Sequence, residues 1–275
     1  MVNDRLQIEL DRYYAYGGDR CVRYTHRLRI NQIRKLIADL TDRHKQSDTL
    51  KALDAGCCHG VYSIMLAEAG YEVFAIDIDH EGIRKARRWA GERGMQNKII
   101  FDVGDIQNIK QGDSTFDVVI CSEVLEHLDV PNDGARELYR VLKPNGKAIV
   151  SMPNMACLFG LLQWSYRKSG IRSLLGKPPL DIFQIQHSRY WFGNIQRLLK
   201  DSGFILDGKY STSHLPYFWE VDALLEKAVP ASSITHAVGD WMGRWPIVKY
   251  FGYNFIVVAH KPGAASIPVH GARYS

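Results

Sequence analysis

The chain has 275 residues, 46% of them hydrophobic, so it is long enough to bury one large core, and we expect residues 1–275 to form a single domain. The formal net charge of +5, without a run of five like charges, does not by itself indicate a nucleic-acid partner. No stretch of eighteen apolar residues would span a membrane, and five cysteines follow a charged start without a signal segment, which predicts a cytoplasmic protein.

Residues 1–48 form a leader ahead of the regular strand and helix pattern. An aromatic segment with a Gly17-Gly18 hinge comes first, and apolar residues at helical spacing follow it. These apolar residues are Ile30, Ile33, Leu36, Ile37 and Leu40. The leader is therefore expected to contain an amphipathic helix.

The core, residues 49–154, begins with a strand that ends in a glycine turn. The turn reads Leu53-Asp54-Ala55-Gly56-Cys57-Cys58-His59-Gly60, and helical periodicity starts at Val61. Its two glycines let a ligand press against main chain at a helix N-terminus. Asp77 ends the next apolar run, where a carboxylate can bind both hydroxyls of a ribose. The Gly-x-x-x-Gly spacing differs from the Gly-x-Gly-x-x-Gly of dinucleotide turns, which disfavours a nicotinamide oxidoreductase.

The later elements follow in one order. An amphipathic stretch leads to Gly104-Asp105-Ile106, a buried run at 116–122 ends at Ser122, and a turn at 142–146 enters a strand at 147–154. Residues 50–154 thus resemble class I S-adenosylmethionine-dependent methyltransferases, with Cys58 where a middle glycine is common. The resemblance implies S-adenosylmethionine as the cofactor. Its expected contacts are Asp54, Gly56, Cys57 and Gly60 in the turn, Asp77 at the ribose, Asp105 and Ile106 at the adenine, and also Ile78 and Ser122.

Glu123, Glu126 and His127 follow the fourth strand at spacings i, i+3 and i+4. If the chain turns helical at once, all three side chains share one face of the cleft. Such a set suits Mg²⁺ or another divalent cation, although imidazole is an uncommon ligand for Mg²⁺. The string also resembles ubiquinone-pathway O-methyltransferases and small-RNA 2′-O-methyltransferases, in which a metal holds the acceptor, and His187 would be the fourth ligand. Alternatively, His127 acts without metal as a catalytic base or orienting group, or is purely structural.

Two insertions, residues 155–190 and 213–246, interrupt the pattern after the core. Ligands of such sheets bind beyond the carboxyl ends of the strands, so we expect these insertions to be helical lids, with His187 and Tyr190 at the substrate. An apolar run at 158–164, followed by Arg167 and Lys168, either packs as a lid helix or lies on a membrane surface. In related methyltransferases the leader also closes over the cofactor, and the candidates here are Tyr14, Arg23, Tyr24 and His26.

The patterns together predict an α/β fold, a doubly wound, Rossmann-like and mostly parallel sheet of seven strands. The last strands are expected at 204–206 and 250–259, after a helix at 191–199, and the resemblance makes the final strand antiparallel. Residues 262–275 would form a loose tail.

We expect an enzyme that methylates oxygen on a small-molecule or lipid-like acceptor. An RNA 2′-O-methyltransferase is the first alternative, although the chain has no broad basic face. A non-catalytic S-adenosylmethionine-binding protein is the second, because Cys58 departs from the glycine pattern. Peripheral membrane contact remains open, and the sequence does not indicate an oligomeric state.

Overall fold

The computed structural model describes residues 20–43, 50–154, 192–212, 241, 245, 252 and 254–263. Tertiary contacts divide the chain into two compact units. One comprises Met1–Ile33, Pro153–Ile182 and Tyr210–Phe255, and the other comprises Arg34–Met152, Phe183–Lys209 and Ile256–Ser275. The latter, called the core unit below, contains the glycine turn and every candidate residue from Asp54 to His127.

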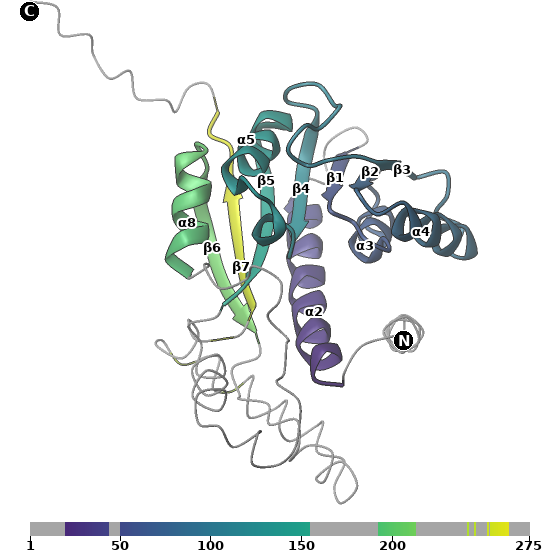
Figure 1. The fold of residues 1–275 in the computed structure, drawn as a ribbon, viewed down its shortest axis with the longest axis horizontal. Helices are drawn as coiled ribbons and strands as arrows, with labels where there is room; N and C mark the ends of the chain where they lie inside the picture. The colour runs from purple at the N-terminus through teal and green to yellow at the C-terminus, as the bar shows by residue number, and fades with distance from the viewer. Residues whose placement is uncertain are drawn as a thin grey trace, which may run out of the picture. The chain divides into compact units, whose positions relative to one another are not determined.

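Seven strands form one sheet in the order β3-β2-β1-β4-β5-β7-β6 (Figure 1). Their bounds are β1 Lys51–Ala55, β2 Glu72–Asp77, β3 Ile99–Val103, β4 Phe116–Ser122, β5 Leu142–Pro153, β6 Ile205–Thr212 and β7 Asn254–His260. Strands β1 to β5 pair in parallel. β7 runs antiparallel to its neighbours, and Lys261, just after it, exchanges backbone hydrogen bonds with Asn145 and Gly146 at the start of β5. The predicted α/β fold is confirmed, including the antiparallel final strand.

The described helices are α2 Arg20–Arg43, α3 Val61–Glu68, α4 His80–Glu92, α5 Pro131–Val141 and α8 Phe192–Asp201, with a short 3₁₀ turn, η1, at Leu125–His127. α3 is buried from Val61 to Ala67, which is the pattern of a helix enclosed on all sides. α4 begins where the Asp79 side chain accepts a hydrogen bond from the Glu81 N–H, and α5 begins at a proline. These local signals fix the helix starts beside the strand ends.

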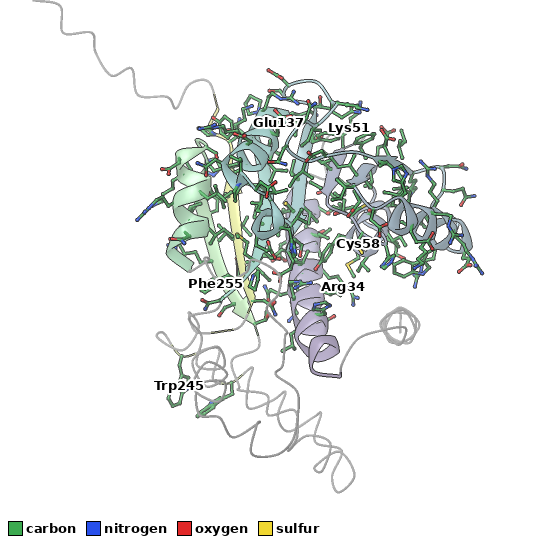
Figure 2. The ribbon with its side chains drawn as sticks, in the orientation of Figure 1. Arg34, Lys51, Cys58, Glu137, Trp245 and Phe255 are labelled. Carbon is green, nitrogen blue, oxygen red and sulfur yellow. The ribbon has the colours of Figure 1, made fainter. Side chains whose placement is uncertain are left out.

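The hydrophobic core lies between the central strands and the helices α5 and α8. β1 and β4 are continuously buried over most of their length, as expected for parallel strands covered on both faces. Leu138 from α5 and Leu199 from α8 complete the same cluster. Lys51 is the first residue of β1, and Cys58 follows the last residue of that strand, Ala55 (Figure 2), so the glycine turn lies at the carboxyl edge of the sheet.

Several predictions fall on residues that the structure does not describe. The insertions, except for Trp241 and Trp245, lie outside the described residues, as do His187, Tyr190, Tyr14 and residues 264–275. The leader helix is longer than predicted, since α2 extends from Arg20 to Arg43. None of the described helices combines the length and apolar character needed to cross a bilayer.

Candidate active site

The turn after β1 is built from residues with left-handed backbone conformation. Gly56, Cys58 and Gly60 have φ angles of 78°, 48° and 85°. A Cβ on Gly56 would overlap the side chain of Val124 and lie 2.8 Å from its Cγ1 atom, so both backbone and packing require glycine there. The turn is secured by hydrogen bonds from the N–H groups of Gly56 and Cys57 to the carbonyl oxygen of Ile76, at 2.8 and 2.9 Å.

The carboxylate of Asp77 stands at the end of β2 and faces this turn. Its Oδ2 atom accepts a hydrogen bond from the Cys58 N–H at 2.7 Å, and Oδ1 accepts one from the Asp79 N–H at 2.9 Å. Each carboxylate oxygen has a second lone pair that can accept a further hydrogen bond. Cysteine in place of a glycine at position 58 therefore does not disrupt the turn. Cys58 adopts the left-handed backbone conformation, and its N–H still orients the Asp77 carboxylate. Ile78, next to Asp77, is 73% exposed.

The loop after β3 places an exposed carboxylate, Asp105, at the same edge of the sheet. Asp105 Oδ1 accepts a hydrogen bond from the Gln107 N–H at 2.8 Å, which sets the direction of the carboxyl group. The Gly104 N–H donates to the Asp77 carbonyl oxygen at 3.0 Å and joins this loop to the end of β2. The Ile106 side chain is buried in the core and supports the loop from below.

Asp54 lies beneath the turn and is completely enclosed. Its Oδ2 atom accepts a hydrogen bond from the Ser63 hydroxyl at 2.6 Å, and its side chain has no significant exposure. Burial raises the pKa of Asp54 to about 7, and the negative charge of Asp77 adds to the rise. At neutral pH this carboxyl group is thus close to the midpoint between its neutral and charged forms.

The thiols around the turn are weakly acidic. Burial is the main cause that raises the pKa of Cys57 and of Cys121, and it raises the pKa of Cys58 to about 11. Cys58 Sγ lies 3.2 Å from His59 Nδ1. Burial and the charge of Lys85 lower the pKa of His59 to about 4. These cysteines are therefore suited to packing around the turn and poorly suited to nucleophilic chemistry.

A chain of hydroxyl groups leads from the helix after the turn to Glu123. The Tyr62 hydroxyl oxygen lies 3.3 Å from Ser122 Oγ, which lies 2.8 Å from Ser151 Oγ. Ser151 Oγ in turn donates to Glu123 Oε1 at 3.2 Å. Sequence reasoning missed Tyr62 and Ser151. The signal available for Ser151 was a small polar residue inside the buried strand β5, which proves to pair with Ser122.

The chain does not turn helical directly after Ser122, so the condition for a common face of Glu123, Glu126 and His127 is not met. Glu123 has a φ angle of 58° and donates its N–H to the Ser151 carbonyl oxygen at 2.9 Å, so it extends the β4–β5 pairing in a left-handed conformation. Only the short η1 turn follows, and α5 begins at Pro131. Glu126 is buried at 2% exposure whereas His127 is exposed, so the expected common face of three side chains does not form.

The donor set for a divalent cation is incomplete in the residues that the structure describes. Among these residues, no three His, Cys, Asp or Glu side chains are grouped closely enough to hold a metal ion. His187, the expected fourth ligand, lies outside the described ranges. The metal site at Glu123, Glu126, His127 and His187 stays a prediction.

The comparisons with known proteins agree with this geometry. The protein family described as "Methyltransferase domain" matches residues 53–150. Residues 53–150 are therefore similar to a methyltransferase domain. The match begins in β1 and ends in β5, so the matched segment contains the glycine turn, Asp77, Asp105 and the Ser122–Glu123 segment.

Proteins of known name match about half of the chain. The chain is 34% identical over 129 residues to the ubiquinone biosynthesis O-methyltransferase of Rickettsia felis, covering 47% of this chain and 52% of that protein. It therefore spans about half the length of the curated relatives it matches. Two solved structures share the fold. The cyclase SpnF has 20% identity and a TM-score of 0.56, covering 84% of this chain and 82% of its own. Geranyl diphosphate methyltransferase, solved with S-adenosylmethionine, has 14% identity and a TM-score of 0.53, covering 83% and 85%.

Proposed function

We propose that the chain transfers the methyl group of S-adenosylmethionine to an oxygen atom of a small-molecule or lipid-like acceptor. The observation that carries the proposal is the Asp77 carboxylate, held by two backbone N–H groups beside a turn of three left-handed residues. The Asp77 carboxylate can still accept hydrogen bonds from two ribose hydroxyls. The glycines of the turn leave the backbone accessible to the rest of the cofactor. The methyltransferase domain and the names of its relatives support the same reaction.

The residues at the turn fit each part of this cofactor. Asp77 would bind the ribose, Asp105 would accept a hydrogen bond from the adenine amino group, and the exposed Ile78 side chain would contact the cofactor beside Asp77. Gly56 and Gly60 would let the methionine part approach the backbone. Bound S-adenosylmethionine supplies an electrophilic methyl group on a positively charged sulfur. The protein then contributes mainly alignment of the acceptor oxygen with that methyl group.

We propose that the His127 ring accepts the proton of the acceptor hydroxyl group. His127 is exposed overall, but partial burial of its ring lowers its pKa below the ordinary value of 6.5, so the ring is mainly neutral near pH 7 and can accept a proton. The residue lies at the end of η1, after the β4 strand end that carries Ser122 and Glu123. A hydroxyl acceptor needs such a group, because its oxygen is a weak nucleophile until the proton is shared or removed.

Isothermal titration calorimetry with S-adenosylhomocysteine tests the proposal without knowledge of the acceptor. The wild-type protein should bind this product, and Asp77→Ala should weaken binding by about tenfold or more, the loss expected for charged hydrogen bonds to the ribose. Asp102→Asn is the matched control, since Asp102 is an exposed carboxylate on the neighbouring strand β3. A wild-type protein that binds NAD and not S-adenosylhomocysteine would refute the proposed function.

A further inference from the structure

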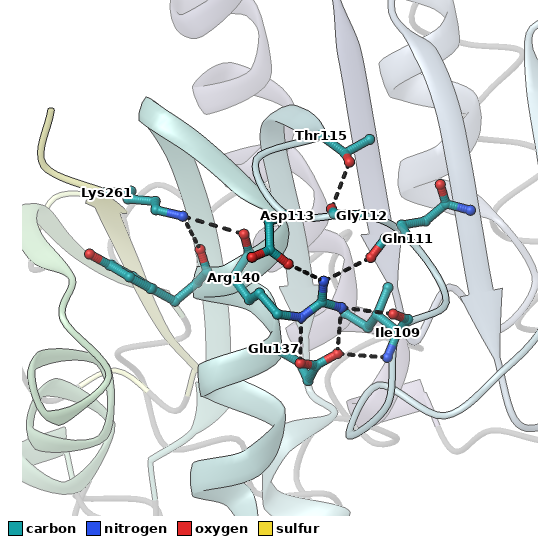
Figure 3. Close-up of polar contacts among 9 residues, drawn as sticks. Ile109, Gln111, Gly112, Asp113, Thr115, Glu137, Arg140 and Lys261 are labelled. Carbon is teal, nitrogen blue, oxygen red and sulfur yellow. Dashed lines mark hydrogen bonds and ion pairs between the residues drawn. The ribbon is translucent and has the colours of Figure 1, made fainter. Parts of the chain in front are cut away.

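The loop between β3 and β4, residues 104–115, is tied to helix α5 by an arginine and a glutamate (Figure 3). Arg140 and Glu137, called the loop clamp below, face each other across one helical turn. Arg140 Nε donates to Glu137 Oε1 at 2.7 Å, and Nη2 donates to Glu137 Oε2 at 2.8 Å. This bidentate pair leaves N–H groups of the guanidinium for other acceptors.

Those N–H groups bind the loop at three points. Arg140 Nη2 donates to the carbonyl oxygen of Ile109 at 2.8 Å. Nη1 donates to the carbonyl oxygen of Gln111 at 2.8 Å and to Asp113 Oδ1 at 2.7 Å. Glu137 Oε2 accepts the Ile109 N–H at 2.9 Å. The loop clamp thus binds both backbone polar groups of Ile109.

The segment between the loop clamp and Asp105 is short and stiff. The Asn108 N–H donates to the Asp105 carbonyl oxygen at 3.1 Å, which closes a turn that ends one residue before Ile109. Ile106 and Ile109 are both buried in the core. At the other end, the Gly104 N–H is bound to the Asp77 carbonyl oxygen. The Asp105 backbone is therefore fixed from both sides.

We propose that Arg140 and Glu137 are positioning residues for adenine recognition, because they hold the loop that presents Asp105. The inference rests on the proposed function, in which Asp105 accepts a hydrogen bond from the adenine amino group. Neither clamp residue needs to touch the cofactor. Their effect is transmitted through Ile109 and the turn at residues 105–108. Recognition of a planar base depends on the direction of one carboxylate, so a small displacement of the loop weakens binding.

The test compares binding of S-adenosylhomocysteine with binding of S-inosylhomocysteine, in which a carbonyl replaces the adenine amino group. Arg140→Lys keeps the charge but cannot bind Glu137 and three loop acceptors at once. We expect this variant to bind S-adenosylhomocysteine about tenfold more weakly and to lose most of its preference for the adenosyl over the inosyl compound. Glu137→Gln should act in the same direction, because an amide oxygen is a weaker acceptor for the Ile109 N–H.

Arg136→Lys is the matched control. Arg136 lies one turn earlier on α5 and forms an exposed pair with Asp133 at 3.2 Å, on its own helix, so its substitution should leave both affinities unchanged. Thermal unfolding of each variant establishes the folded fraction. Should Arg140→Lys fail to fold, Asp113→Ala removes a single clamp contact at a side chain that is 76% exposed, and it should reduce the preference by a smaller factor.

The outcomes separate the two proposals. If the wild-type protein does not bind S-adenosylhomocysteine, the proposed function fails. If the wild type binds and the clamp variants keep the wild-type affinity and preference, the positioning role is refuted. An equal loss of affinity for both compounds would also refute it, because that result reports general loosening of the site and no effect on adenine recognition.

Discussion

Replacing Asp54 with asparagine should make the stability of the protein less dependent on pH. Burial raises the pKa of this carboxyl group from an ordinary 3.8 to about 7 in the folded state. Below about pH 4 the carboxyl group is protonated in both the folded and the unfolded state, so its burial does not lower the free energy of unfolding. As pH rises from about 4 to about 7, the unfolded chain releases the proton while the folded protein keeps it, so the free energy of unfolding decreases. Above that range the penalty is constant.

The size of the effect follows from the width of this window. Each unit of pKa difference corresponds to about 1.4 kcal/mol, so the shift of roughly three units costs about 4 kcal/mol at pH 8. That is a large share of the roughly 5–15 kcal/mol by which a domain is stable. Because Asp54 is fully enclosed, solvent does not reduce the effect as it would at the surface.

Urea denaturation of wild type and Asp54→Asn from pH 4.5 to pH 8 measures this difference. Other titrating groups are shared by the two proteins, so they cancel when the free energies of unfolding are subtracted. The variant should gain stability relative to the wild type as pH rises, and the gain should level off above pH 7. In Ser63→Ala, which keeps Asp54, the decrease in stability should extend to higher pH, because loss of the Ser63 hydroxyl raises the Asp54 pKa further. A subtracted free energy that stays flat across pH would refute the burial argument.

Two further predictions concern the turn and the proposed base. Gly56→Ala should lower the free energy of unfolding by about 2–5 kcal/mol, because the new Cβ combines a left-handed backbone conformation with overlap against Val124. Urea denaturation measures this loss. It should show no such loss for Gly91→Ala, where a Cβ meets nothing within 4 Å. Equal stability of the two variants would contradict this. By NMR, the His127 ring should titrate below its ordinary 6.5, with the signal assigned through its loss in His127→Gln. A midpoint at or above that value would remove the argument for a neutral base.

Much of the fold could be predicted from the sequence because its signals are local. Strand runs, the glycine turn and the proline at the start of α5 each depend on a few neighbouring residues. Element ends were less accurate. The leader helix extends ten residues further toward the N-terminus than its apolar spacing indicated, since helical residues outside the apolar face leave no periodic signal.

The candidate site could be predicted only where neighbouring residues in the sequence determine the local backbone conformation. Asp77 and the turn glycines were found because a turn and a strand end leave a recognisable pattern. The segment after Ser122 was not, because its conformation is set by Ser151 on a neighbouring strand, 28 positions later in the chain. The Arg140 contacts with residues 109–113 were missed for the same reason, since their partners come from a loop about 30 positions earlier.

The order of the last three strands in the sheet has a consequence for synthesis on the ribosome. β6 precedes β7 in the chain, yet among the described strands its neighbour in the sheet is β7, which lies between it and β5. Until β7 has left the exit tunnel, the nascent chain exposes the unpaired edge of β5, and β6 has no strand to pair with. The parallel strands β1 to β5 can therefore pair early, while completion of the sheet waits for the final strand.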